Sequence, residues 1–337
     1  MYMENNLSIN FDNNEYLPNN LRKYIIKKFI NIGSIKTQHP DFGNYKIAST
    51  LGWGFPHSHT YKSWLHLIFK KQSFYPPSII VKKNFLNKDK IKNFIGNERK
   101  ILKPDRGHSG QNIHIVHSYE NVVKKINNNG YWILQKEIKP KLYQGRKFDT
   151  RVFHFILQHK GNWYNLISSV GYAKVSSKQF NQNDDNINGF VTNITFNQNK
   201  GMQVMFEFFD FMEKISNNDE ERKKLINNVY NLIRDYTKLM VKQLNEQNKM
   251  YFKDGKSISQ IMILGPDIIF DTHGNTFLLE TNSSPGILIV KELVYPLQKQ
   301  MIDELIKNIL VPIIKEENIN LDNYKGKTLT AERIYID

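Results

Sequence analysis

The sequence contains no cysteine in its 337 residues, which excludes disulfide bonds, thiolate metal sites and a cysteine nucleophile. Long apolar runs are also missing, because the longest, Ile261–Leu264 and Ile309–Ile314, fall far short of the roughly 20 residues that a membrane-spanning helix needs. The segment 1–20 is rich in Asn and lacks the basic start and apolar core of a secretory signal. We therefore expect a cytoplasmic protein with no membrane partner.

Acidic residues are few relative to basic ones, with 32 Asp and Glu against 47 Lys and Arg, which gives a net charge of +15 at pH 7. Such a charge favours polyanionic partners, for example nucleic acid, nucleotides or an acidic protein segment. The basic residues are scattered and form no recognisable nucleic-acid reader motif, so nucleic-acid binding is the weaker alternative. A biased genome base composition, visible in the abundant Asn, Lys and Ile, would produce the same charge without any role.

Apolar residues make up 40% of the chain, enough for a sizeable core. The length predicts two domains, or three small ones, at about 100–200 residues each. Alternating residues predict two antiparallel hairpins, one over 148–172 and one over 261–280. Helices are predicted in separate blocks at 21–32, 61–69, 88–94, 118–128, 203–215, 219–245 and 296–314. Hairpins together with separate helical blocks indicate an α+β (mixed α/β) chain.

The second hairpin carries a candidate metal site. Glu280 and Asn282 project from one face of a strand because side chains alternate with period two, and Asp267 on the partner strand can meet them. Three oxygen ligands on a rigid pair of strands suit Mg²⁺. This ion prefers oxygen ligands and commonly takes some of them from phosphates and water. The alternative is a polar strand face beside a β-turn, and Asp271 is better explained as a residue of that turn.

Two further segments have the composition of an anion site. Lys103 stands at a strand end before a loop of small polar residues that reaches Asn112, and backbone N–H groups in such a loop can hold phosphates. Lys147, Asp149 and Arg151 share one face of the first hairpin. The alternative for the first segment is a plain polar hairpin loop. The alternative for the second is a ladder of charged side chains exposed to solvent.

These segments, in this order, resemble the tubulin–tyrosine ligase-like family of ATP-grasp ligases. That family carries Lys-Pro before a Gly-rich loop, a Gln-Lys-Tyr-like stretch, Arg-Lys-Phe-Asp-Ile/Leu-Arg, His-Leu-Thr-Asn, a Gly-x-Asp strand and Glu-x-Asn-x-x-Pro. The corresponding segments here are Lys103–Asn112, Gln135–Ile138, Arg146–Arg151, Phe190–Asn193, Gly265–Asp267 and Glu280–Pro285. The resemblance runs from about Phe74 to Ile313, most of the chain.

The resemblance implies an ATP-grasp fold with the nucleotide held between a central subdomain, 61–140, and a C-terminal subdomain, 141–315. An N-terminal arm and small subdomain at 1–60 and a polar tail at 316–337 complete the expected organisation. Nucleotide contacts, including an adenine hinge over 135–138, are implied for Lys103, Gly110, Gln135, Lys136, Glu137, Ile138, Lys147, Asp149 and Thr192. Catalytic roles near the transferred phosphoryl group are implied for Arg151, Lys174 and Asn193, and ligation of one or two Mg²⁺ ions for Asp267, Glu280 and Asn282.

Three positions depart from the family pattern. Asn112 replaces the second loop glycine, and we expect the loop to survive because Asn tolerates left-handed backbone. Glu137 replaces the common Tyr of the hinge, where backbone contacts can suffice. Phe190-Val191 replaces His-Leu. No departure removes a metal ligand, which argues against a ligase-fold protein that binds ATP without turnover.

The activity implied by the resemblance is ATP- and Mg²⁺-dependent amide-bond formation through an acyl-phosphate. A free amino acid, which is tyrosine, glutamate or glycine, would be added to an acidic protein or peptide acceptor such as a tubulin tail, and polyglutamylation is one such reaction. We expect a monomer. An ATP-grasp ligase for a non-tubulin peptide or a small molecule remains the alternative within enzymes.

Overall fold

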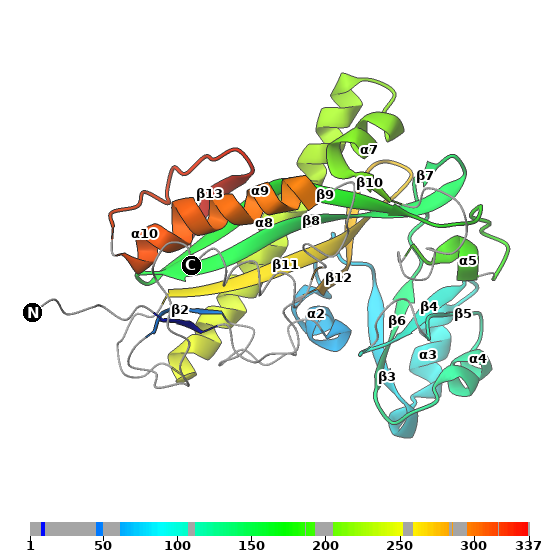
Figure 1. Cartoon of the computed structure of the whole chain (residues 1–337). Helices are drawn as coiled ribbons and strands as arrows, with labels where there is room; N and C mark the ends of the chain where they lie inside the picture. Colours follow the sequence, from blue (N-terminus) through cyan, green and yellow to red (C-terminus); the bar gives the residue numbers. More distant parts are fainter. Residues whose placement is uncertain are drawn as a thin grey trace, which may run out of the picture.

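The computed structural model describes residues 8–10, 45–49, 61–106, 112–185, 187–192, 205–251, 259–282, 285, 295–315 and 317–335. Figure 1 shows two sheets, a large one crossed by long helices and a small one carried on the other side of α2 (Lys62–Phe69). This combination of mainly antiparallel sheets and separate helices confirms the α+β class. The candidate site lies where the two sheets approach each other.

The small sheet has the strand order β3-β6-β4-β5, and all its pairings are antiparallel. Two helices cover one face, and each begins at the side chain that the sequence predicts: Asn87 accepts from the Lys90 N–H, and Ser118 accepts from the Asn121 N–H. Their apolar residues pack with Trp132 and Leu134 into one core. The elements are β3 (Ser78–Lys82), a 3₁₀ turn (Lys83–Phe85), α3 (Lys88–Ile95), β4 (Lys100–Pro104), β5 (His114–Val116), α4 (Tyr119–Lys125) and β6 (Tyr131–Lys136).

The large sheet is organised around the hairpin of β8 (Arg146–His159) and β9 (Asn162–Val175). Its turn uses Lys160 and Gly161, both with positive φ, as a tight hairpin turn requires. A second hairpin, β11 (Ser259–Phe270) with β12 (Thr276–Asn282), pairs with β8 through β11. The remaining strands are β1 (Ser8–Asn10), β2 (Tyr45–Ser49), β7 (Leu142–Tyr143), β10 (Met205–Glu207) and β13 (Leu329–Ile334).

Helices bury both faces of the large sheet (Figure 1). One face packs on α2, α7 (Phe208–Ile215) and the long α8 (Asp219–Tyr251). The other packs on α9 (Tyr295–Leu305), which continues through a π-helical turn (Ile306–Leu310) into α10 (Val311–Ile314). Because both faces are covered, the central strands are apolar on both sides, and the buried charges of the candidate site stand out against them.

Several sequence expectations need correction. Residues 205–207, expected in a helix, form β10, which pairs with β9 before α7 begins. The α4 helix ends at Lys125, short of residue 128. The segment after 316, expected only as a polar tail, contributes β13, which pairs with β9 over residues 163–168. The helix expected at 21–32 lies outside the described residues.

Within the described part of the chain, none of the helices is both long and apolar enough to cross a bilayer. The subdomain bounds drawn from the resemblance stay a prediction. A short helix, α5 (Ile187–Phe190), follows β9 after a loop over residues 176–185 and brings the chain to the small sheet (Figure 1).

Candidate functional site

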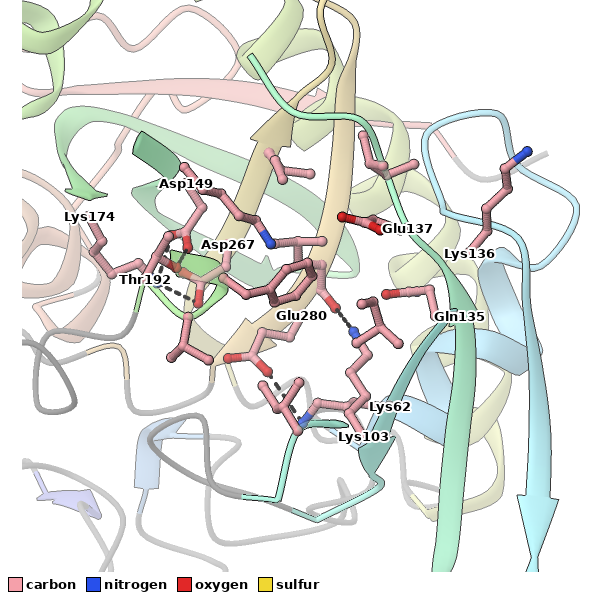
Figure 2. Close-up of a pocket in the computed structure, with 18 of the residues that line it drawn as sticks. Lys62, Lys103, Gln135, Lys136, Glu137, Asp149, Lys174, Thr192, Asp267 and Glu280 are labelled. Carbon is pink, nitrogen blue, oxygen red and sulfur yellow. Dashed lines mark hydrogen bonds and ion pairs between the residues drawn. The ribbon is translucent and has the colours of Figure 1, made fainter. Parts of the chain in front are cut away.

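A cavity opens between the small sheet and the β8–β9 and β11–β12 hairpins (Figure 2). Its walls come from elements far apart in the sequence, namely α2, β4, β6, β8, β9, β11, β12 and the segment that follows α5. Its polar and charged lining residues are Lys62, Lys103, Gln135, Lys136, Glu137, Lys147, Asp149, Lys174, Thr192, Asp267 and Glu280. Ile101, Ile113, Ile138, Phe190, Ile269 and Leu279 supply apolar surface.

The carboxylate of Asp267 is buried at the cavity wall. Arg151 donates to both of its oxygens, Nε to Oδ1 and Nη2 to Oδ2, each at 2.7 Å. Lys174 Nζ lies 2.8 Å from Asp267 Oδ2 and 2.8 Å from Asp149 Oδ1. Thr192 donates its hydroxyl to Asp149. Two carboxylates and two cations thus form one buried network.

Strand register brings these groups together. Asp267 of β11 stands opposite Arg151 of β8, and Asp149 of β8 stands opposite Lys174 of β9. Because side chains two apart share a strand face, Asp149 and Arg151 lie on the same side of β8. Asp149 lines the cavity, and Arg151 contacts Asp267 without lining it. The sequence predicted the shared face of β8, and the register explains why it is not a solvated ladder.

Burial and neighbouring charges perturb these groups in opposite directions. Burial and the nearby Asp267 raise the pKa of Asp149, although Lys174 opposes the change. Burial would also raise the pKa of Asp267, but Arg151 and Lys174 hold it well below its usual range. The two carboxylates raise the pKa of Lys174 in spite of its burial. Lys174 therefore stays charged, and Asp267 carries the firmer negative charge of the pair.

A second cluster of charges lies beside this network, around Glu280, which stands opposite Asp267 on the neighbouring strand. Lys62 of α2 places Nζ 3.3 Å from Glu280 Oε2, and Lys103 of β4 donates to the Leu279 carbonyl oxygen at 3.2 Å (Figure 2). Burial, with a smaller contribution from the Lys62 charge, lowers the pKa of Lys103 to about 7. Burial would raise the pKa of Glu280, but the positive charge of Lys62 and more distant lysines keep it below its ordinary value.

Lys147 forms a third cationic point on the cavity wall. Its ammonium group lies 3.4 Å from the ring centroid of Phe190, and its burial lowers its pKa to about 8. The side chains of Lys62, Lys103 and Lys147 are thus all buried. Lys62 pairs with a carboxylate, whereas Lys103 contacts a carbonyl oxygen and Lys147 an aromatic ring. Such groups are the usual contacts of phosphate oxygens.

The expected adenine hinge forms one edge of the cavity. Gln135 donates its amide to the Ser78 hydroxyl at 2.9 Å, which fixes its side chain. Lys136 points away from the cavity (Figure 2), and its ammonium group lies 3.6 Å from Glu98. Lys136 therefore lines the cavity with its backbone. Glu137 is held by Arg99 through both of its oxygens, with Nη2 2.7 Å from Oε1.

The donor set at Asp267, Glu280 and Asn282 fits a hard cation such as Mg²⁺. The register pairs Asp267 with Glu280 and Gly265 with Asn282 on adjacent strands. The amide nitrogen of Asn282 lies 3.4 Å from Asp267 Oδ2, so its amide oxygen is the atom that could ligate. Within the described residues no group of three His, Cys, Asp or Glu side chains is placed to hold a metal, so any cation site here rests on two carboxylates and an amide.

The structure brings most of the sequence-predicted site residues to one cavity. Gly110 and Asn193 lie outside the described residues. Asn112 has the left-handed conformation expected of it, with φ 56°. Asp271 accepts from the N–H groups of His273 and Asn275, as a turn residue does.

Lys62 and Arg99 were not among the residues predicted from the sequence. Lys62 reaches the cavity because Asp105, directly after β4, accepts from the Ser63 N–H at 2.7 Å, and Arg106 stacks on Tyr61 at 4.3 Å. These contacts fix the start of α2 beside Lys103. The two parts are more than 40 residues apart in the chain, so no local sequence pattern indicates the contact.

Comparison with known proteins gives one family and a set of relatives. The model of the tubulin-tyrosine ligase family matches residues 69–319. "Tubulin glycylase 3F" from Tetrahymena thermophila is 25% identical over 224 residues, which cover 60% of this chain and 23% of that protein. "Probable alpha-tubulin polyglutamylase Ttll1" from the same organism is 24% identical, over 53% of this chain and 42% of that protein. "Probable tubulin polyglutamylase ttll-9" from Caenorhabditis elegans is 24% identical, over 65% of this chain and 54% of that protein. This chain thus spans between about a quarter and a half of the length of these relatives.

Proposed function

Because this chain belongs to the tubulin-tyrosine ligase family, we propose that it is an ATP- and Mg²⁺-dependent ligase that joins a free amino acid to a protein carboxylate. One observation carries the proposal: three buried lysines and two carboxylates on paired strands converge on the same cavity between two sheets. A triphosphate and its cation have complementary charges to that set. A plain carbohydrate or apolar ligand would leave the buried ammonium groups of Lys103 and Lys147, which contact a carbonyl oxygen and an aromatic ring, without a close counter-charge, at a high cost.

The proposed reaction has two steps. An oxygen of the acceptor carboxylate attacks the γ-phosphorus of ATP, forming an acyl-phosphate and releasing ADP. The neutral amine of the amino acid then attacks the acyl carbon, the C–O bond to phosphate breaks, and the amine loses a proton as the amide forms. Neither step needs a nucleophilic side chain, so the absence of cysteine is no obstacle.

The chain's own residues supply position and charge in this scheme. Lys103, Lys62 and Lys147 would contact phosphate oxygens, and the backbone of 135–138 would hold the base. Arg151 and Lys174, which are fixed by Asp267 and Asp149, would lie next to the transferred phosphoryl group and offset its charge. Asp267, Glu280 and Asn282 would hold Mg²⁺, which when bound supplies further charge neutralisation at the phosphate oxygens.

The acceptor proposed is an acidic tubulin tail. The matched relatives are named for glycine and glutamate addition to tubulin, and the net charge of +15 suits a polyanionic segment. Tyrosine, glutamate and glycine all remain candidates for the amino acid.

The test is incorporation of each labelled amino acid into tubulin and into an acidic tail peptide, with ATP and Mg²⁺ present or withheld. Glu280→Gln is the matched control, since it removes one charge and hardly changes the volume. We expect incorporation that needs ATP and is lost in Glu280→Gln, while the melting temperature of the variant stays near that of the wild type. Full activity in a folded Glu280→Gln protein would remove the metal assignment, and no ATP-dependent incorporation into any tail would remove the proposed function.

A further inference from the structure

One arginine outside the cavity joins the small sheet to the loop at residues 176–185. Arg99, just before β4, donates from Nη1 to the Asp184 carbonyl oxygen at 3.0 Å and lies 4.0 Å from Asp185 Oδ1. His117, just after β5, adds a second contact, because its Nε2 lies 2.9 Å from both oxygens of Asp185. The loop and the α5 helix after it are thereby held against β4 and β5 (Figure 1).

The same arginine holds the cavity wall. Its Nε and Nη2 both meet the carboxylate of Glu137, and both side chains are only 9% exposed. A guanidinium that meets a carboxylate with two parallel N–H groups is fixed in orientation as well as in position. Arg99 therefore binds Glu137, at the cavity wall, with Nε and Nη2. Its remaining nitrogen, Nη1, donates to the loop.

Contacts continue from Arg99 into the cavity through two aromatic rings. The Arg99 guanidinium lies 5.9 Å from the ring centroid of Phe180 in the loop, and the Phe180 ring lies 6.4 Å from that of Phe190. Phe190 lines the cavity and covers the ammonium group of Lys147. The Phe180 N–H donates to the Gly145 carbonyl oxygen at 2.9 Å, so the base of the loop is tied to the start of β8 as well.

The outer part of the loop buries little of its surface. Residues 181–185 are exposed, so their burial contributes little to keeping the loop closed. Segments with few buried contacts open at low free-energy cost. The contacts of Arg99 and His117 attach the loop tip to the small sheet.

We propose that Arg99 is a positioning residue that keeps the 176–185 loop closed on the small sheet and so holds Phe190 over the nucleotide cavity. The inference rests on the proposed function, in that the ligand of the cavity is taken to be ATP. It also gives Glu137, where the family resemblance leads one to expect Tyr, a task of its own: Glu137 orients the guanidinium that closes the loop.

The experiment measures ATP binding to the whole chain, its KM and kcat, and trypsin cleavage after Lys178, an exposed site inside the loop. For Arg99→Ala we expect the dissociation constant and KM for ATP to rise by about tenfold or more, a typical effect of losing a charged hydrogen-bonded contact. The kcat at saturating ATP should change less. Cleavage after Lys178 should become faster, and ATP should protect the variant less than it protects the wild type.

Two further variants separate closure from simple stability. His117→Ala removes only an exposed contact to the loop tip, so it should fold normally and shift KM and cleavage in the same direction by a smaller factor. Arg234→Ala is the matched control, because Arg234 meets Glu332 with the same two-pronged geometry, Nη2 to Oε1 at 2.7 Å, far from the cavity. It should leave the KM for ATP and the cleavage after Lys178 unchanged.

The possible results test the role of Arg99 and the proposed ATP-dependent function separately. A wild-type protein that binds no ATP would remove the proposed function. A wild type that binds ATP, with Arg99→Ala and His117→Ala binding it equally well, would overturn the role of Arg99 and leave the function intact. Faster cleavage in these variants with unchanged ATP binding would also overturn it, because the loop would then be attached without closing the cavity.

Discussion

The lowered pKa of Lys103, at the end of β4, predicts a measurable pH dependence of nucleotide binding. Burial, with Lys62 adding a smaller repulsion, lowers the pKa of Lys103 to about 7. The protein alone therefore holds Lys103 about half protonated at neutral pH. Phosphate oxygens beside Lys103 would favour its charged form, so nucleotide binding should raise its pKa and take up a proton.

The magnitude follows from these two states. Below pH 7 Lys103 is charged with and without nucleotide, so the affinity is constant. Above pH 7 only the bound form keeps the proton, and the affinity falls as the pH rises. With a free pKa of 7 and a bound pKa well above 9, the affinity falls about 50-fold between pH 7 and pH 9. Lys147, whose pKa is lowered to about 8 by burial, adds about another tenfold over the same interval if it too contacts phosphate.

The measurement is calorimetric titration with a non-hydrolysable ATP analogue and Mg²⁺, in two buffers of different ionisation enthalpy. The number of protons taken up on nucleotide binding should be larger for wild type than for Lys103→Met, by about half a proton at pH 7 and by nearly one at pH 8. Protons that the nucleotide itself binds or releases are the same for both proteins and cancel in this difference. Lys136→Met is the control, because Lys136 lines the same cavity but points its charge away from it (Figure 2). If Lys103→Met kept the wild-type pH dependence and proton uptake, Lys103 would not contact the phosphates.

Three further outcomes follow from other parts of the site. Lys174→Met leaves Asp149 and Asp267 buried without the ammonium group between them, so the free energy of unfolding should fall by about 3–5 kcal/mol in urea titrations, and an unchanged value would show that the pair is solvated. Asn112→Gly should keep both stability and activity, whereas Asn112→Val, at φ 56°, should destabilise the chain by about 1–2 kcal/mol, as thermal melts would reveal. The KM for an acidic tail peptide should rise steeply with salt while the KM for ATP rises less, because exposed charges are screened beyond about 8 Å at 0.15 M salt, and a salt-independent peptide KM would remove the electrostatic account of acceptor binding.

The parts of the fold that follow from local periodicity were predictable. Alternation gave both long hairpins, and Asn87 and Ser118 marked the starts of α3 and α4. The same alternation put Glu280 and Asn282 on one strand face, and the closeness of Asp267 followed from the hairpin. These features need only the backbone geometry of one strand or one turn.

Features that depend on pairing between distant segments were not predictable. β10 and β13 are short strands that both add to β9, and neither has an alternation long enough to be recognised alone. Lys62 reaches Glu280 only because Asp105 holds the first turn of α2. Such contacts are set by the packing of whole elements, which a single sequence does not encode locally.

The buried network links charged residues to which separate roles had been assigned. The family resemblance implied a metal-ligand role for Asp267 and a phosphate-facing role for Arg151 and Lys174, as separate roles. The structure joins them, because the carboxylate proposed to ligate the cation also forms ion pairs with both Arg151 and Lys174. A carboxylate buried this deeply is costly unless cations surround it, so Arg151 and Lys174 contribute to the stability of the site as well as to its proposed chemistry. A substitution at Asp267 would consequently affect the proposed metal site, the orientation of Arg151 and the charge balance at Lys174 together. Glu280 stands opposite Asp267 but forms its ion pair with Lys62, so its substitution tests the proposed metal site with less disturbance of Arg151 and Lys174.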